Sequence, residues 1–184
     1  MEKDRKSRAV LYILRAALLM ICFWKWGIDV RALVSGVFLT VLTYIAEQDI
    51  YTRRIPDRLL LGVGAVGIMS VPFFPEISLV SRGAGAIGVS LFLLAAALTA
   101  QGGFGGGDIK LMAASGWLLG YRAMIPAIFI GILTGGIYCI WMLARGKMTR
   151  KDRFAFGPFL AIGLAASCIY GEQILEWYLS VWQI

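Results

Sequence analysis

A series of apolar runs, each followed by a short polar or glycine-rich stretch, limits what this chain can fold into more than any other feature. Seven such runs cover about residues 9–26, 32–47, 58–74, 84–100, 109–121, 123–144 and 155–171. A helix needs about 20 apolar residues to span a bilayer, and only helices and closed barrels satisfy their backbone groups in lipid. The pattern therefore predicts an all-α, polytopic transmembrane helical bundle.

The composition agrees with this prediction. Hydrophobic residues make up 59% of the chain and charged residues only 16%, whereas a soluble domain carries about 25% charged residues. The net charge of +7 would be compatible with nucleic-acid binding in a soluble protein. Here the basic residues cluster in short loops between apolar runs, so we interpret them as topology signals that also contact anionic membrane lipids. No nucleic-acid partner is expected.

The first run could be mistaken for a signal peptide, because basic residues precede it. No small-residue cleavage site follows it, and the bulky Trp24 and Trp26 stand at its end, so a retained helix is expected. The tail after the last run is compatible with an interfacial helix or with the frayed end of that run. The chain thus divides into three predicted parts: a basic segment with one helix (1–30), a membrane core (31–171) and the tail (172–184).

The basic residues also predict sidedness. An even number of runs separates the N-terminus, the polar loop at 47–58, the glycine-rich loop at 102–107 and the basic loop at 145–153, which places all four on one side. That side carries thirteen Lys and Arg residues and the opposite side four. By the positive-inside rule the first side is the cytoplasmic face of the plasma membrane.

Some kinds of chemistry are excluded by what the chain lacks. It contains no histidine, which rules out Ser-His-Asp and Cys-His catalysis in their usual forms and HExxH zinc hydrolysis. Cys22, Cys139 and Cys168 lie far apart within apolar runs and form no CxxC pair. We therefore expect no metal site and no cofactor. Any reaction must depend on carboxylates, hydroxyls, Lys or Arg.

Two aspartates stand out by their positions. Asp108 follows the glycine-rich loop and begins an apolar run, and Asp49 ends one. Asp108 and Asp57 also suit the capping of a helix start. Asp49 does not, because the dipole at a helix end disfavours an anion. Asp49 and Asp108 fall on the same predicted face, and ionisable groups at such depth mark candidate functional sites.

A pair of neighbouring carboxylates supports one reaction in particular. Repulsion between like charges splits the titration of the pair, so that it shares one proton over a useful pH range. One carboxylate then takes a proton from water while the other protonates the scissile carbonyl. The sequence therefore favours aspartyl peptide hydrolysis at Asp49 and Asp108.

Three blocks of the chain, in this order, resemble the type IV prepilin peptidase family of membrane aspartic proteases with a GxGD signature. The resemblance covers about residues 31–171. Its blocks are Asp49 followed by Arg53-Arg54-Ile55-Pro56-Asp57, the GxGD match Gly105-Gly106-Gly107-Asp108 with Ile109-Lys110-Leu111-Met112-Ala113-Ala114, and Phe156-Gly157-Pro158-Phe159-Leu160-Ala161 with Ala155 where the family often has proline.

The resemblance implies a six-helix peptidase core with one additional N-terminal helix, and Asp49 and Asp108 as its catalytic dyad. It implies cleavage of the basic leader of a prepilin, pseudopilin or preflagellin-like precursor on the cytoplasmic side. Larger members carry an insert with paired CxxC motifs linked to N-methylation. This chain has no such motif, so it resembles the short, peptidase-only branch, with no methyltransferase activity and no zinc expected.

Further residues near the dyad are secondary candidates for the loop or for substrate contact: Gly105, Gly106, Gly107, Lys110, Glu47, Asp57, Phe156 and Pro158. Glu47, Asp57 or Asp152 would attract a basic leader, although each also fits a solvated charge. Two other functions stay open. Carboxylates in a membrane also serve ion-coupled transporters, and a non-catalytic pilus or secretion assembly factor would carry unreactive ones.

Overall fold

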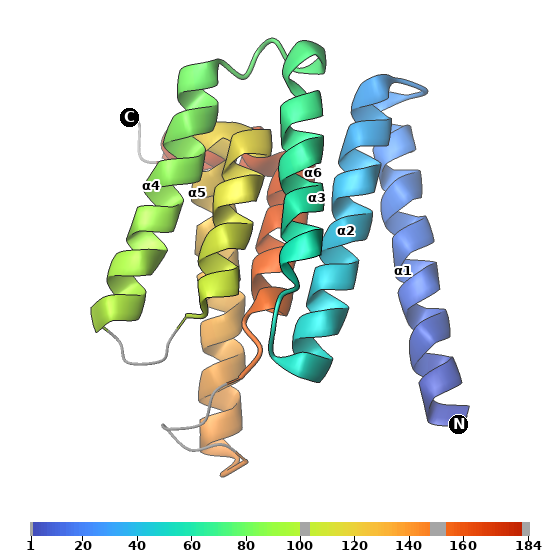
Figure 1. The fold of residues 1–184 in the computed structure, drawn as a ribbon, viewed down its shortest axis with the longest axis vertical. Coiled ribbons are helices and arrows are strands. Elements are labelled where there is room, and N and C mark those ends of the chain that lie inside the picture. The colour runs from blue at the N-terminus through green and yellow to red at the C-terminus, as the bar shows by residue number, and fades with distance from the viewer. Residues whose placement is uncertain (1, 100–103, 148–153, 182–184) are drawn as a thin grey trace.

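The structure is a computed structural model that describes residues 2–99, 104–147 and 154–181, with only the backbone of residues 2–10. Within these residues every regular element is a helix, which confirms the all-α prediction (Figure 1). The elements are α1 (Glu2–Trp26), α2 (Val30–Thr52), α3 (Asp57–Met69), the short 3₁₀ helix η1 (Val71–Phe73), α4 (Leu79–Thr99), α5 (Gly106–Ala144) and α6 (Gly157–Val181).

The long α5 consists of two helical segments that run in opposite directions. Gly120 interrupts it with φ 74° and ψ 168°, a conformation that costs little only for glycine. In Figure 1 the first half rises from its start near the base of α4, and the second half returns downwards. Two predicted runs, 109–121 and 123–144, thus correspond to the halves of α5, and the first half is short, as the sequence predicted.

The connections of the bundle gather at its two ends. The N-terminus, the α2–α3 connection, the start of α5 and the start of α6 lie at one end, and the α1–α2 turn and η1 at the other (Figure 1). This arrangement agrees with the counting of crossings in the sequence. The cytoplasmic assignment of the first end depends on charge and stays a prediction.

The core faces inward from α2, α5 and α6, and large apolar side chains cover much of the outside. Phe38, Leu111 and Leu160 are fully buried, whereas Val80 and Phe129 are exposed. Within the described residues, four helices, α2, α4, α5 and α6, are long and apolar enough to cross a membrane. Such a surface suits lipid, so a multi-pass membrane protein follows. The helices α1 and α3 are not among the four, and their predicted crossings remain predictions.

Several element boundaries differ from the prediction. The run at 58–74 forms α3 only to Met69, followed by η1. The last run does not end at residue 171, because α6 continues to Val181 after a break at Tyr170 (φ −129°, ψ 15°). The described part of the tail is therefore a helical extension of α6. The last residues of the run at 84–100 and of the tail, including Trp182, lie outside the described residues.

Arg82, which falls between the predicted runs 58–74 and 84–100, lies inside α4 and is fully buried. Its guanidinium donates hydrogen bonds to the carbonyl oxygens of Trp117 and Leu118 at 2.9 and 3.3 Å and to the hydroxyl of Ser70 at 2.9 Å. The first two carbonyls precede the break at Gly120 and lack their full set of helical partners. Arg82 thus stabilises the reversal of α5 at the end of the bundle opposite to Asp49.

Candidate active site

Asp49 lies in the last turn of α2, as the sequence predicted. The helix ends at Thr52 because Arg53 adopts a left-handed conformation (φ 52°), and the Arg53 N–H donates to the carbonyl oxygen of Asp49 at 2.8 Å. Only 6% of Asp49 is exposed. A buried carboxylate at a helix end needs hydrogen-bond donors from elsewhere in the fold.

The start of α6 supplies such a donor. The backbone N–H of Gly157 donates to Oδ2 of Asp49 at 2.8 Å. A Cβ atom at position 157 would lie 2.7 Å from the same oxygen, closer than real Cβ contacts. A side chain at this position would therefore force the carboxylate of Asp49 to shift. The free N–H groups at the start of a helix also favour a neighbouring negative charge.

Asp108 is the third residue of α5 and caps its start. Its Oδ2 accepts a hydrogen bond from the backbone N–H of Gly105 at 2.9 Å, and 7% of the residue is exposed. The capping interpretation of Asp108 is therefore correct for one of its oxygens. The cap is compatible with a role beside Asp49, because it uses one oxygen of Asp108 and keeps the carboxylate at the same end of the bundle as Asp49.

The structure brings these two aspartates together. The charge of Asp49 acts electrostatically on Asp108, and the helices that carry them, α2 and α5, both pack against α3 and α6. The rings of Phe104, before α5, and Phe156, before α6, meet edge to face with centroids 4.8 Å apart. In the described part of the chain, neither aspartate forms an ion pair with a Lys or Arg within 4.0 Å. Among the described residues, one oxygen of each carboxylate accepts a backbone hydrogen bond, and the other oxygen has no protein donor.

Some of the secondary candidates lie next to the two aspartates, and others form ion pairs away from them. Phe156 is buried beside Gly157, and Pro158 follows in the first turn of α6. Lys110 and Asp57 form an exposed ion pair of 2.8 Å with each other. Glu47 is not a solvated charge, because it pairs with Arg15 at 2.7 Å and its side chain is only 20% exposed.

The glycines before Asp108 differ in their surroundings. Gly105 supplies the N–H bonded to Asp108, and a Cβ atom at Gly107 would lie 3.1 Å from Ile55 of the α2–α3 connection. A Cβ atom at Gly106 would meet no atom within 4 Å. The first two residues of the glycine-rich loop, Gly102 and Gly103, and the candidate Asp152 lie outside the described residues.

Sequence reasoning missed Gly157 as a partner of Asp49. The residue belongs to the Phe156-Gly157-Pro158-Phe159 block, which could equally well have been an ordinary helix start. The contact is made by a backbone N–H, which every residue except proline carries. What distinguishes position 157 is the close approach of its backbone to the carboxylate of Asp49, which leaves no room for a side chain.

Comparison with known proteins places the chain in a family. The model of the type IV leader peptidase family matches residues 36–140, a region that includes Asp49 and Asp108. The chain belongs to this family. Among similar proteins, the prepilin leader peptidase/N-methyltransferase of Bacillus subtilis is 31% identical over 164 residues, which are 85% of this chain and 63% of that protein.

Other relatives carry the same name. The protein of Xanthomonas campestris is 30% identical over 173 residues, 91% of this chain and 60% of that protein. The protein of Neisseria gonorrhoeae is 37% identical over 145 residues, 76% of this chain and 48% of that protein. The chain thus spans less than two thirds of the length of these relatives. No solved structure matches it.

Proposed function

We propose that this chain is an aspartic endopeptidase of the plasma membrane that removes the leader from type IV prepilin-like precursors on the cytoplasmic side. One observation carries the proposal: two buried carboxylates from helices far apart in the sequence, Asp49 and Asp108, lie at the same end of an apolar bundle and interact electrostatically. Membership of a leader peptidase family supports it. The excess of basic residues at the same end supports the cytoplasmic assignment.

The proposed reaction follows from the chemistry of a carboxylate pair that shares a proton. The ionised carboxylate takes a proton from water, and the water oxygen bonds to the scissile carbonyl carbon while the protonated carboxyl donates to the carbonyl oxygen. When the tetrahedral species collapses, the C–N bond breaks, the leaving amine receives the proton that the first carboxylate took from water, and the second carboxylate takes back a proton from the hydroxyl that becomes part of the new carboxyl group. The N–H groups of Gly157 and Gly105 each hold one carboxylate oxygen, which leaves the other available for proton transfer.

The proposed substrates are precursors of the prepilin, pseudopilin or preflagellin type, because the relatives are named prepilin leader peptidases. Anionic lipids are proposed neighbours of the basic end. We propose cleavage without N-methylation, since the three cysteines of the chain form no paired CxxC motif. A methylated product made by the purified protein would contradict this part of the proposal.

The test is to make Asp49→Asn and Asp108→Asn separately and to incubate each purified protein with a candidate prepilin. Each change removes a group that takes or gives a proton, so cleavage should fall by about 100-fold or more. The product is measured by mass spectrometry. Asp29→Asn is the matched control, because Asp29 precedes α2 at the opposite end of the bundle, and its cleavage rate should equal that of the wild type.

Cleavage by both Asn variants at the wild-type rate would refute the dyad. A wild-type protein that binds the precursor without cutting it would indicate an assembly factor. Ion uptake in proteoliposomes without proteolysis would indicate a transporter.

A further inference from the structure

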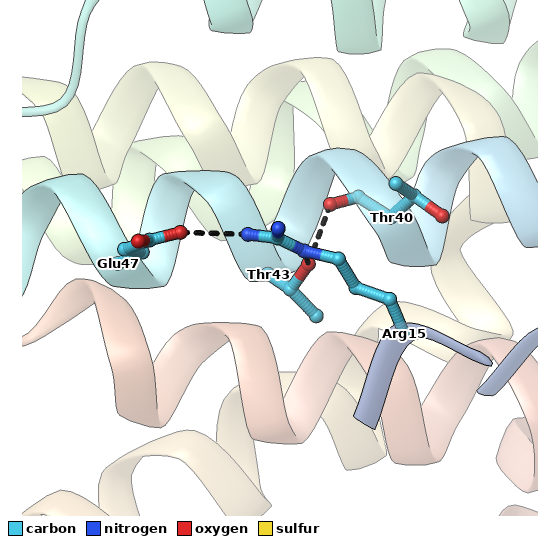
Figure 2. Close-up of polar contacts among 4 residues, drawn as sticks. All are labelled: Arg15, Thr40, Thr43 and Glu47. Atoms are coloured by element: carbon cyan, nitrogen blue, oxygen red, sulfur yellow. Dashed lines mark hydrogen bonds and ion pairs between the residues drawn. The ribbon is translucent and has the colours of Figure 1, made fainter. Parts of the chain in front are cut away.

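A buried arginine joins α1 to α2 close to the candidate site. Arg15 of α1 is 8% exposed. Its Nε donates to the hydroxyl of Thr43 at 2.8 Å, and its Nη2 donates to Oε2 of Glu47 at 2.7 Å (Figure 2). Figure 2 shows the guanidinium extended along α2 between these two acceptors. The two acceptors lie one turn apart on α2, so the guanidinium lies parallel to the axis of that helix.

One further contact fixes this guanidinium, and one fixes the hydroxyl that it bonds. Its central carbon lies 3.6 Å from the centre of the Tyr44 ring, a cation–π arrangement that is strongest where water is excluded. The Thr43 hydroxyl, which accepts from Arg15, donates in turn to the carbonyl oxygen of Thr40 at 2.7 Å. Hydrogen bonds in such chains reinforce one another in surroundings of low dielectric constant.

These contacts hold the turn that leads to Asp49. Glu47 lies two residues before Asp49, on a different face of α2. Arg15 of α1 therefore binds Glu47 on one face of the end of α2. On another face, the N–H of Gly157 at the start of α6 donates to Asp49 at 2.8 Å. Both carboxylates lie in the last turns of α2, where the helix dipole disfavours anions. Arg15 neutralises one of the two.

The surroundings make the ion pair hard to replace. Glu47 and Thr43 line a groove of about 460 Å³ between α1, α2 and α6 whose other walls are mostly apolar, including Leu14, Leu42 and Ile162. A buried charge without its partner is strongly unfavourable. If Arg15 lost its charge, Glu47 would move towards water, and the end of α2 would move with it.

We propose that Arg15 and Glu47 form a positioning pair for Asp49, which sets the orientation of the end of α2 and through it the geometry of the dyad. The inference rests on the proposed peptidase function for its kinetic consequence. It also has a structural consequence that does not depend on catalysis: the hydrogen bond from the Arg53 N–H to the Asp49 carbonyl should be less protected when the pair is broken.

The test compares Arg15→Gln, Glu47→Gln, the double variant and Arg15→Lys. Arg15→Gln leaves Glu47 charged and alone, so kcat for prepilin cleavage should fall by about 10- to 100-fold with KM within roughly twofold of the wild type. The double variant carries no unpaired charge and should recover most of the lost kcat. Arg15→Lys keeps the positive charge but lacks the planar guanidinium, so its kcat should lie between those of Arg15→Gln and the double variant.

Hydrogen exchange of residues 48–53 is measured in parallel. It should be about 10-fold faster in Arg15→Gln and return towards the wild type in the double variant. Trp24→Ala is the control on α1, because Trp24 is 84% exposed, and it should change neither measurement.

Wild-type kcat and exchange in Arg15→Gln would overturn the proposal. Losses of kcat in Arg15→Gln and Glu47→Gln that simply add in the double variant would also overturn it, because the two residues would then act independently. If the wild type cleaves no prepilin, the peptidase function fails, and the exchange measurements still decide whether the pair orders the end of α2.

Discussion

Each aspartate of the candidate dyad is held by one backbone N–H at the start of a helix. Gly157 begins α6 and bonds Asp49, and Gly105 precedes α5 and bonds Asp108. Backbone donors are fixed by the fold and do not titrate. They therefore orient a carboxylate without supplying a counter-charge that would keep it permanently ionised, which suits a pair that must share a proton.

Gly157→Ala should reduce prepilin cleavage by about 10-fold or more. The added methyl group would lie 2.7 Å from Oδ2 of Asp49, so the carboxylate must shift from its present position, and small misplacements of this kind are costly. The rate is measured by mass spectrometry of the product. Gly136→Ala is the matched control, because a Cβ atom there meets no atom within 4 Å. Equal rates in both variants would contradict the role of the Gly157 contact.

At the scale of elements, α4 and the first half of α5 pack with their backbones in direct contact. A Cβ atom at Gly85 would lie 2.7 Å from the backbone carbon of Gly120, and one at Gly116 would lie 2.5 Å from that of Gly85. Small residues allow such close approach between membrane helices. The contact places the short first half of α5, and thus Asp108, at a fixed depth in the bundle.

Gly116→Ala should lower the free energy of unfolding by about 1–3 kcal/mol, because the methyl group forces the two helices apart. The measurement is reversible unfolding in mixed detergent micelles. Gly88→Ala, in the same helix pair but with no atom within 4 Å of the added Cβ, is the control and should be neutral or slightly stabilising. Equal stability of the two variants would show that the contact is not tight in the membrane.

Arg82→Lys should also destabilise the protein, by about 1–3 kcal/mol, because lysine cannot reach all the acceptors that the guanidinium bonds. Those acceptors include the Ser70 hydroxyl and the Trp117 carbonyl. Thermal unfolding measures the loss. Since Arg82 lies at the end opposite to Asp49, the variant that remains folded should cleave prepilin at the wild-type rate, and a selective loss of kcat would contradict a purely structural role.

At the scale of the whole molecule, the bundle gathers at one end the candidate dyad and the connections that surround it. The exposed Arg53 and Arg54 follow α2 at that end, and the α1–α2 turn with Ile28 lies at the other (Figure 1). The positive-inside rule then assigns a direction to the whole molecule.

Labelling of single cysteines tests this assignment. In a variant without native cysteines, Arg54→Cys should react with a membrane-impermeant maleimide only after the cytoplasmic side is opened, and Ile28→Cys should react in intact cells. Ile28 is fully exposed in the bundle, so its reactivity reports on membrane sidedness. Labelling of both from the same side would contradict the predicted topology.

The sequence alone was enough for much of this description. Apolar runs of spanning length predict helices because lipid leaves the backbone no other partners, and the even number of runs between the polar loops places Asp49 and Asp108 at one end. The absence of histidine excluded the histidine-dependent hydrolytic mechanisms. The glycines before Asp108 drew attention to that aspartate as a candidate catalytic residue. These inferences succeed because they depend on local composition and on the parity of crossings, which need no knowledge of packing.

Other features were decided only by the tertiary structure. The N–H of Gly157 reaches Asp49 across 108 residues of sequence, Arg15 pairs with Glu47 across 32, and Arg82 is buried rather than exposed in a connector. Each depends on which faces of two helices meet and at what depth. That choice is made by close packing of many side chains at once, and no local pattern in the chain records it.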